Sequence, residues 1–288
     1  MLAVVSPVIV VVLVALGLSS LHSRLRPLIA SRMLLILLVI GAFAALPVIF
    51  NFVIGALFEI PFFGSWMHDG AHVRNFHVDI GGTFAIIVLC YLTYLLFKLI
   101  KLNRSYRSSR FLSTSEIVVV EHENPFAFVT PGLNGEITIS SALVEMLSPS
   151  ELQIVVAHET AHRQGRHDRI LLIGNICIAI VPFMRFVLRR LEFSLERIAD
   201  DCAAKFIGSR KLVARTLTRV ALSDNLPALT MGISKVGVAA RIVALTNESG
   251  RMTQRNLAML WALVFSLLPI TLLQWHHVVE SLRMVCGL

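Results

Sequence analysis

Residues 148–168 read SPSELQIVVAHETAHRQGRHD, and this stretch predicts a helix with a metal site on one face. Ser148 and Glu151 have the spacing of a capping box, and Pro149 takes the first helical position. The apolar run of residues 152–157 continues the helix from there. The helix therefore begins at a defined residue and extends into the part of the stretch that contains histidine.

The central part of this helix, residues 158–162, spells HETAH, an HExxH motif. His158 and His162 lie four positions apart on one helical face, about 6 Å from each other, so both rings can reach one metal ion. Glu159 lies between them, where a general base can act on a water held by the metal. We therefore expect one zinc ion per chain, with His158 and His162 as ligands and Glu159 as the catalytic residue. The alternative is two histidines on an ordinary core helix.

The composition of the chain is that of an integral membrane protein. Of its 288 residues 56% are hydrophobic, and the mean hydropathy is +0.76, which is unusual for a soluble domain. The net charge of +8 comes from basic residues that flank apolar segments, so we expect a lipid bilayer as partner and no nucleic acid. The four cysteines form no CxxC pair and predict no disulfide framework.

Four apolar segments predict about four transmembrane helices, at residues 2–20, 33–58, 83–100 and 257–275. Basic residues follow the first and third segments, whereas the loop of residues 59–82 contains a single arginine. The positive-inside rule then places the N-terminus and this loop outside, and the HExxH motif in the cytoplasm. We expect a multi-pass protein of the bacterial inner membrane. Its predicted parts are residues 1–110 with three spans, a peptidase domain at 111–256, and a fourth span with a short external tail at 257–288.

A third zinc ligand is expected beyond the apolar segment of residues 170–188, where the acidic side chains are Glu192, Glu196, Asp200 and Asp201. A full crossing would separate them from His158 by about 30 Å. Pro182 lies midway, so two helical arms of about 21 Å each allow the chain to return. We therefore predict a membrane-associated helical hairpin over residues 170–195, with a fifth span and no zinc site as the alternative.

Glu196 and Asp200 are four residues apart and share a helical face. We expect Glu196 as the third metal ligand and Asp200 as the group that holds a ligand histidine. A donor for the oxyanion of the reaction is also needed, and the candidates are His167, Arg189 and Arg190.

Three short strands are predicted before the zinc helix, at residues 116–120, 126–129 and 136–140. Together with the helices they predict an α+β zinc-peptidase domain of the gluzincin type. One edge of such a sheet could bind an extended peptide as an added strand. The alternative is a small sheet that only covers the zinc helix.

Residues 125–220 resemble the peptidase domain of family M56, the membrane metallopeptidases of bacteria that include antibiotic sensors. The matching stretches are residues 125–132, 137–152, 158–168 and 195–200, with Asn175 and Pro182 between them and a weaker match at 239–242. The resemblance implies His158, His162 and Glu196 as ligands and Glu159 as base. It also implies Asp200 and Asp168 as supporting residues.

The resemblance to M56 implies a zinc endopeptidase that cleaves a protein substrate in signalling, such as a repressor or a membrane-associated regulator. The chain ends soon after the fourth predicted span, without the penicillin-binding sensor domain of well-known members, so a separate sensor partner is expected. The related family M48 shares HExxH and a downstream ExxxD, but the spacing of Asp168, Asn175 and Pro182 favours M56. The alternatives are an M48-type quality-control protease, similar to HtpX, and a non-catalytic membrane sensor or scaffold.

His68, His72 and His77 cluster in the predicted external loop with two aspartates. Their spacing permits a second metal site, although three histidines in a short polar loop are more often solvated. The sequence leaves both interpretations open.

Overall fold

The structure, a computed structural model, describes residues 2–58, 82–108, 117–130, 135–222, 235–247 and 252–286. Within these ranges the chain is mainly helical, with one small sheet. The cluster of His68, His72 and His77 lies outside the described residues.

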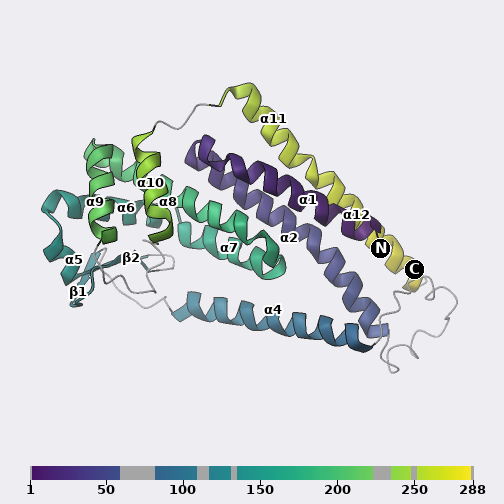
Figure 1. The fold of residues 1–288 in the computed structure, drawn as a ribbon. Coiled ribbons are helices and arrows are strands. Elements are labelled where there is room, and N and C mark those ends of the chain that lie inside the picture. The colour runs from purple at the N-terminus through teal and green to yellow at the C-terminus, as the bar shows by residue number, and fades with distance from the viewer. Residues whose placement is uncertain are drawn as a thin grey trace.

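Long helices make up one part of the molecule, and the sheet lies with shorter helices at one end of them (Figure 1). The long helices are α1 (Leu2–Ser20), α2 (Pro27–Phe58), α4 (Gly82–Ser108), α11 (Gln254–Phe265) and α12 (Leu267–Cys286). Both chain termini lie at the end of the bundle remote from the sheet (Figure 1). Helix α4 runs back from that end toward the sheet, alongside α2 (Figure 1).

Among the described residues, three helical segments are long and apolar enough to cross a membrane: Val5–Arg24, Pro27–Ile54 and Gln254–Glu280. These agree with three of the four predicted spans, and they make the chain an integral membrane protein. The third predicted span lies in α4, which is helical but is not among the three. In α4 the basic residues Lys98, Lys101 and Arg104 follow the apolar run of residues 83–97.

A helical hairpin lies against α2. Its arms are α7 (His167–Ile180) and α8 (Arg185–Ile207), joined by a 3-10 turn at Pro182–Met184. The arms approach closely at Gly174, where an added Cβ would lie only 2.7 Å from the Leu188 side chain. At the turn, the Tyr91 hydroxyl of α4 donates a 2.7 Å hydrogen bond to the Ile180 carbonyl, one of the helix-terminal groups that α7 leaves unpaired. Helix α7 thus ends just before Pro182, and the chain turns back there as the sequence predicts.

The remaining elements form a mixed α/β unit that contains the HExxH helix. They are β1 (Ile117–Val120), β2 (Ala127–Val129), β3 (Ile137–Ser140), α5 (Ser141–Met146), α6 (Pro149–Gln164), α9 (Arg210–Leu222) and α10 (Lys235–Thr246). The strand order is β1-β3-β2, with β3 parallel to β1 and antiparallel to β2. The three predicted strands are thus confirmed, each shifted by at most one residue.

Helix α6 is held between two apolar clusters. Its Ile154 belongs to a cluster with Ala203 of α8 and Val213 of α9. Its Val155 belongs to a second cluster with Ile137 and Ile139 of the sheet. Burial on both sides fixes the position of α6 between the sheet and α8.

Helix α8 also contacts the junction between α1 and α2. Arg197 is buried, and its Nη1 lies 3.3 Å from the carbonyl oxygen of His22 and 3.5 Å from that of Leu25. Arg190 donates a hydrogen bond to the Ser19 hydroxyl of α1. One face of α8 therefore docks on the N-terminal helical pair.

Candidate metal centre

The start of α6 is fixed by the capping box that the sequence predicts. The Ser148 amide donates to Glu151 Oε2 over 2.9 Å, and the Glu151 amide donates to Ser148 Oγ. Arg219 of α9 forms an ion pair with the same carboxylate at 2.9 Å. These contacts hold the helix in register, so that its third and fourth turns present the two histidines.

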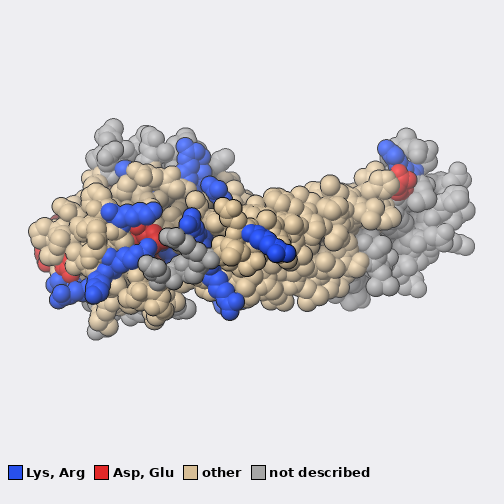
Figure 2. Space-filling view, turned by 90° about the horizontal axis from the view of Figure 1, so that it is seen from above, with Lys and Arg blue, Asp and Glu red and all other residues tan. Residues whose placement is uncertain are grey.

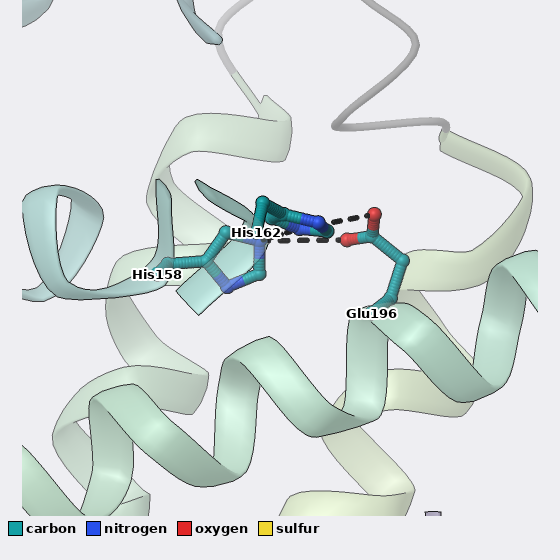
Figure 3. A group of neighbouring side chains, drawn as sticks. All are labelled: His158, His162 and Glu196. Atoms are coloured by element: carbon teal, nitrogen blue, oxygen red, sulfur yellow. Dashed lines mark hydrogen bonds and ion pairs between the residues drawn. The ribbon is translucent and has the colours of Figure 1, made fainter. Parts of the chain in front are cut away.

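His158 and His162 of α6 meet Glu196 of α8 (Figure 3). The two Nε2 atoms lie 3.1 Å apart. Each is 3.5 Å from an oxygen of Glu196, His158 from Oε2 and His162 from Oε1. All candidate ligand atoms lie within 4.8 Å of one another. The structure thus brings together the three residues that the sequence predicts as ligands.

The chemistry of this group fits zinc. Two ligands of a tetrahedral zinc ion, each about 2.1 Å from it, are about 3.4 Å apart, close to the three distances observed here. Glu196 Oε2 is buried and accepts no hydrogen bond of suitable angle, although Arg241 Nη1 lies 2.8 Å away as an ion-pair partner. A buried carboxylate oxygen of this kind gains a partner when a cation is bound.

Asp200 lies behind the first histidine. Its Oδ1 is 3.1 Å from His158 Nδ1, and its side chain is buried. A carboxylate at this position fixes the ring so that Nε2 faces the ligand group. The predicted place of Asp200 next to a ligand histidine agrees with this contact.

Arg241 of α10 is a residue of the site that sequence reasoning missed. Its guanidinium donates to both oxygens of Asp200, over 2.8 and 2.7 Å, and lies 2.8 Å from Glu196 Oε2. Only 3% of the residue is exposed. A lone arginine in the apolar segment KVGVAARIVALT was the available signal, since such a charge needs buried partners.

The acidic groups of the site are kept ionised by this arginine. Burial alone would raise the pKa of Glu196 and of Asp200, but the guanidinium of Arg241 and the neighbouring histidines hold both pKa values below their usual range. The carboxylates in turn raise the pKa of Arg241. Two negative charges are thereby available to a metal ion at neutral pH.

The two ligand histidines differ in their affinity for protons. Burial lowers the pKa of His158, but its contacts with the carboxylates of Asp200 and Glu196 outweigh this effect and raise the pKa to about 10. Burial and the neighbouring His158 lower the pKa of His162 to about 3. Protons therefore compete with a metal mainly at His158.

Glu159 is buried on α6, with 3% of its surface exposed. Burial raises its pKa to about 7, and the nearby Glu196 contributes in the same direction. A carboxylate with this pKa can both accept and return a proton near neutral pH.

The other predicted site residues lie apart from the ligand atoms. His167 contacts the far nitrogen of His162, with the two Nδ1 atoms 2.8 Å apart. Arg190 bonds to α1, and Arg189 is exposed on α8. Asp168 lies in the first turn of α7 next to His167.

Comparisons with known proteins identify a family for this arrangement. The family model described as peptidase family M48 matches residues 100–266, more than half of the chain. The chain is 31% identical over 154 residues to a protein named Protease HtpX homolog from Thermoplasma acidophilum, covering 49% of this chain and 47% of that protein. The chain thus spans about half the length of this relative. No solved structure matches the present chain.

The predicted resemblance to family M56 is wrong, since the match is to M48. The residues that favoured M56 have local roles in this structure. The Asn175 amide donates to the Leu171 carbonyl of its own helix, Pro182 begins the hairpin turn, and Asp168 lies at a helix start. Such positions stabilise any hairpin of this shape, so they do not discriminate between families that share HExxH and ExxxD.

Proposed function

Because the chain belongs to peptidase family M48, we propose that it is a membrane-bound zinc endopeptidase. The observation that supports this most directly is the convergence of His158, His162 and Glu196 from two helices, with Glu159 beside them. When bound, zinc would supply Lewis acidity toward a water and a peptide carbonyl. The proposed hydrolase is metal-dependent and uses one Zn²⁺ per chain.

Each residue has a defined task in this proposal. His158, His162 and Glu196 hold the ion, and Asp200 with Arg241 orients His158 and Glu196 from behind. Glu159 takes a proton from the attacking water and returns it to the nitrogen of the leaving amine. Its raised pKa suits both steps, since neither protonation state is strongly preferred near pH 7.

The substrate would bind in extended form along β2. Phe126, Phe128 and Thr130 direct their backbone groups toward β3, as the bonds from Thr130 to Glu136 and from Ser140 to Phe126 show. The antiparallel alternation leaves the backbone groups of Ala127 and Val129 at the outer edge. Because β2 also packs against α6, a peptide added at this edge would run beside the zinc helix.

The proposed location is the inner membrane, with the N-terminus outside and the zinc site in the cytoplasm. Figure 2 shows basic side chains gathered at the end of the molecule that contains the peptidase elements, while the long helical part is largely free of charge on this face. This distribution supports a cytoplasmic peptidase domain between α4 and α11. The hairpin packs on α2 with exposed apolar side chains such as Ile173, Ile176 and Phe183, which supports its contact with lipid.

Protein quality control in the membrane is the role that we propose. The relative is named for protease activity, and the signalling role depended on the M56 resemblance. A membrane-anchored site beside the small sheet would accept unfolded segments of membrane proteins without strict sequence preference. A deletion strain should then accumulate damaged membrane proteins.

The test is zinc content by elemental analysis of the detergent-purified full chain, with cleavage of an unstructured reporter peptide as the second measurement. We expect about one zinc per chain in the wild type and in Glu159→Gln, and a large loss in Glu196→Ala. Both variants should fail to cleave, and a chelator should abolish wild-type cleavage. Folded wild type that binds no zinc, or Glu159→Gln with full activity, would contradict the proposal.

A further inference from the structure

His167 has no part in the proposed reaction, yet it is built into the site. Only 3% of the residue is exposed, and its Nδ1 lies 2.8 Å from Nδ1 of His162. Two imidazole nitrogens at this distance share one proton, so one ring donates and the other accepts. The rings meet edge to face, with centroids 4.7 Å apart.

The backbone between the two histidines is shaped for this contact. Arg166 adopts the left-handed conformation with a φ of 49°, and it is the one described non-glycine residue with a positive φ. A Cβ on Gly165 would lie 2.5 Å from His167 Nε2 and 2.7 Å from its Cδ2. A left-handed arginine costs about 1–2 kcal/mol, and such strain is typical of functional positions. The reversal returns the first residue of α7 onto α6.

We propose that His167 is a positioning residue that accepts the Nδ1 proton of His162 and thereby leaves the Nε2 lone pair of His162 to a metal. The inference rests on the proposed zinc site. A ligand histidine must be unprotonated at the ligating nitrogen, and a hydrogen bond from its other nitrogen selects that tautomer. Asp200 does the same for His158.

The two supporting partners differ in charge, and this distinguishes the two ligands. His158 donates to a carboxylate, whereas His162 donates to a neutral imidazole. A second carboxylate at position 167 would add negative charge to a site that already has Glu159, Glu196 and Asp200 with Arg241 as the balancing cation. The neutral ring of His167 orients His162 without adding a negative charge that would offset the charge of a bound metal ion.

His167 itself does not reach the ligand group. Its Nδ1 is engaged by His162, and its Nε2 faces the backbone of Gly165. The described group of potential metal ligands contains His158, His162 and Glu196 without it. A direct ligand role is therefore excluded by the geometry, and the remaining alternative is packing alone.

The experiment measures zinc affinity by chelator competition on detergent-purified full chain, for His167→Asn, His167→Leu and Gly165→Ala. Asparagine places an acceptor oxygen near the position of Nδ1, leucine fills the space without one, and Gly165→Ala displaces the ring while retaining it. We expect affinity about 10–100-fold weaker for His167→Leu and Gly165→Ala, and within about fivefold of wild type for His167→Asn. His122→Leu, an exposed histidine of the same domain, is the matched control.

The visible spectrum of the Co²⁺-substituted protein gives a readout that packing alone would not move. His167→Leu should shift the ligand-field bands because the orientation of His162 changes, and His167→Asn should restore them. Equal losses in the leucine and asparagine variants, or wild-type affinity in the leucine variant, would overturn the inference while the zinc proposal stands. A wild type without zinc would instead refute the proposed function together with this inference.

Discussion

At the scale of single residues, Arg241 balances the negative charge of the carboxylates in the candidate metal site. Glu159 and Asp200 are buried and Glu196 is half-buried, and Arg241 is the cation that pairs with Glu196 and Asp200. Breaking a buried ion pair from one side leaves an uncompensated charge in a medium of low dielectric constant. The arginine is therefore needed for stability before a metal is bound.

Replacing Arg241 by alanine should destabilise the metal-free protein by about 3–5 kcal/mol. Zinc should raise the midpoint of thermal unfolding more in this variant than in wild type, because the ion then supplies the missing positive charge. The measurement is thermal unfolding in detergent with and without zinc. Arg210→Ala, which removes an exposed pair with Asp201, is the control and should have little effect. Equal zinc effects in Arg241→Ala and wild type would contradict this account.

Helices α6 and α8 form the site at the scale of elements, and each is fixed at points remote from the metal ligands. The capping box determines where α6 begins, while Arg197 ties α8 to the α1–α2 junction one residue after Glu196. Both anchors act through hydrogen bonds to backbone groups that a helix end or a loop leaves unpaired. Changes there should alter the site without touching a ligand.

Ser148→Ala should cost about 1 kcal/mol of stability, because the amide of Glu151 loses its acceptor. Hydrogen bonds from Ser148 and the ion pair with Arg219 lower the pKa of Glu151. The contribution of ionised Glu151 to the free energy of unfolding is therefore fully present above the ordinary pKa of glutamate. It is lost as the pH falls through the lowered pKa of the folded protein. Unfolding midpoints of wild type and Ser148→Ala at neutral and acidic pH check this. A gap between the two proteins that widens toward acid would be inconsistent with it.

Arg197→Ala should loosen the α1–α2 junction and make α8 exchange faster. The change removes donors to two carbonyl groups, at a cost of about 1–3 kcal/mol. Hydrogen exchange of the α8 amides, with zinc affinity as the second readout, measures the effect. Lys205→Ala on the same helix serves as the control. If exchange is unchanged in Arg197→Ala, the junction does not support α8.

The arrangement of the whole molecule places α6, which carries two of the candidate metal ligands, and the chain termini at opposite ends of the long helices (Figure 1). Helix α4 returns from the end where α2 finishes toward the sheet, alongside the candidate spans. Its composition is less apolar than that of α2. Neighbouring helices cover one side of α4, which packs on α2 and α7.

Single cysteines on α9 and near the end of α12 should lie on opposite sides of the membrane. We expect an impermeant maleimide on intact cells to label Arg283→Cys and to leave Lys211→Cys unlabelled until the cells are opened, in a background without the native cysteines. This follows if α4 crosses the bilayer. Labelling of both positions from outside would show that the peptidase domain lies on the same side as the terminus.

The sequence by itself determined the HExxH helix, its start, the three strands and the pairing of His158 with His162 on one face, because these depend on spacings within one helix or one strand. His158 and His162 need only the helical repeat, and Pro182 needs only its missing amide to end an arm. Only the tertiary structure decided the parts that join distant segments. Arg241 meets Asp200 across 41 positions, and no local period encodes such a contact.

The role of His167 was decided in the same way, because a left-handed Arg166 turns the ring onto His162 and away from the reaction. The family could not be read from Asp168, Asn175 and Pro182, since their contacts serve the hairpin. Local rules specify which side chains can bind a metal. The folding of remote helices onto them specifies what holds those side chains in place.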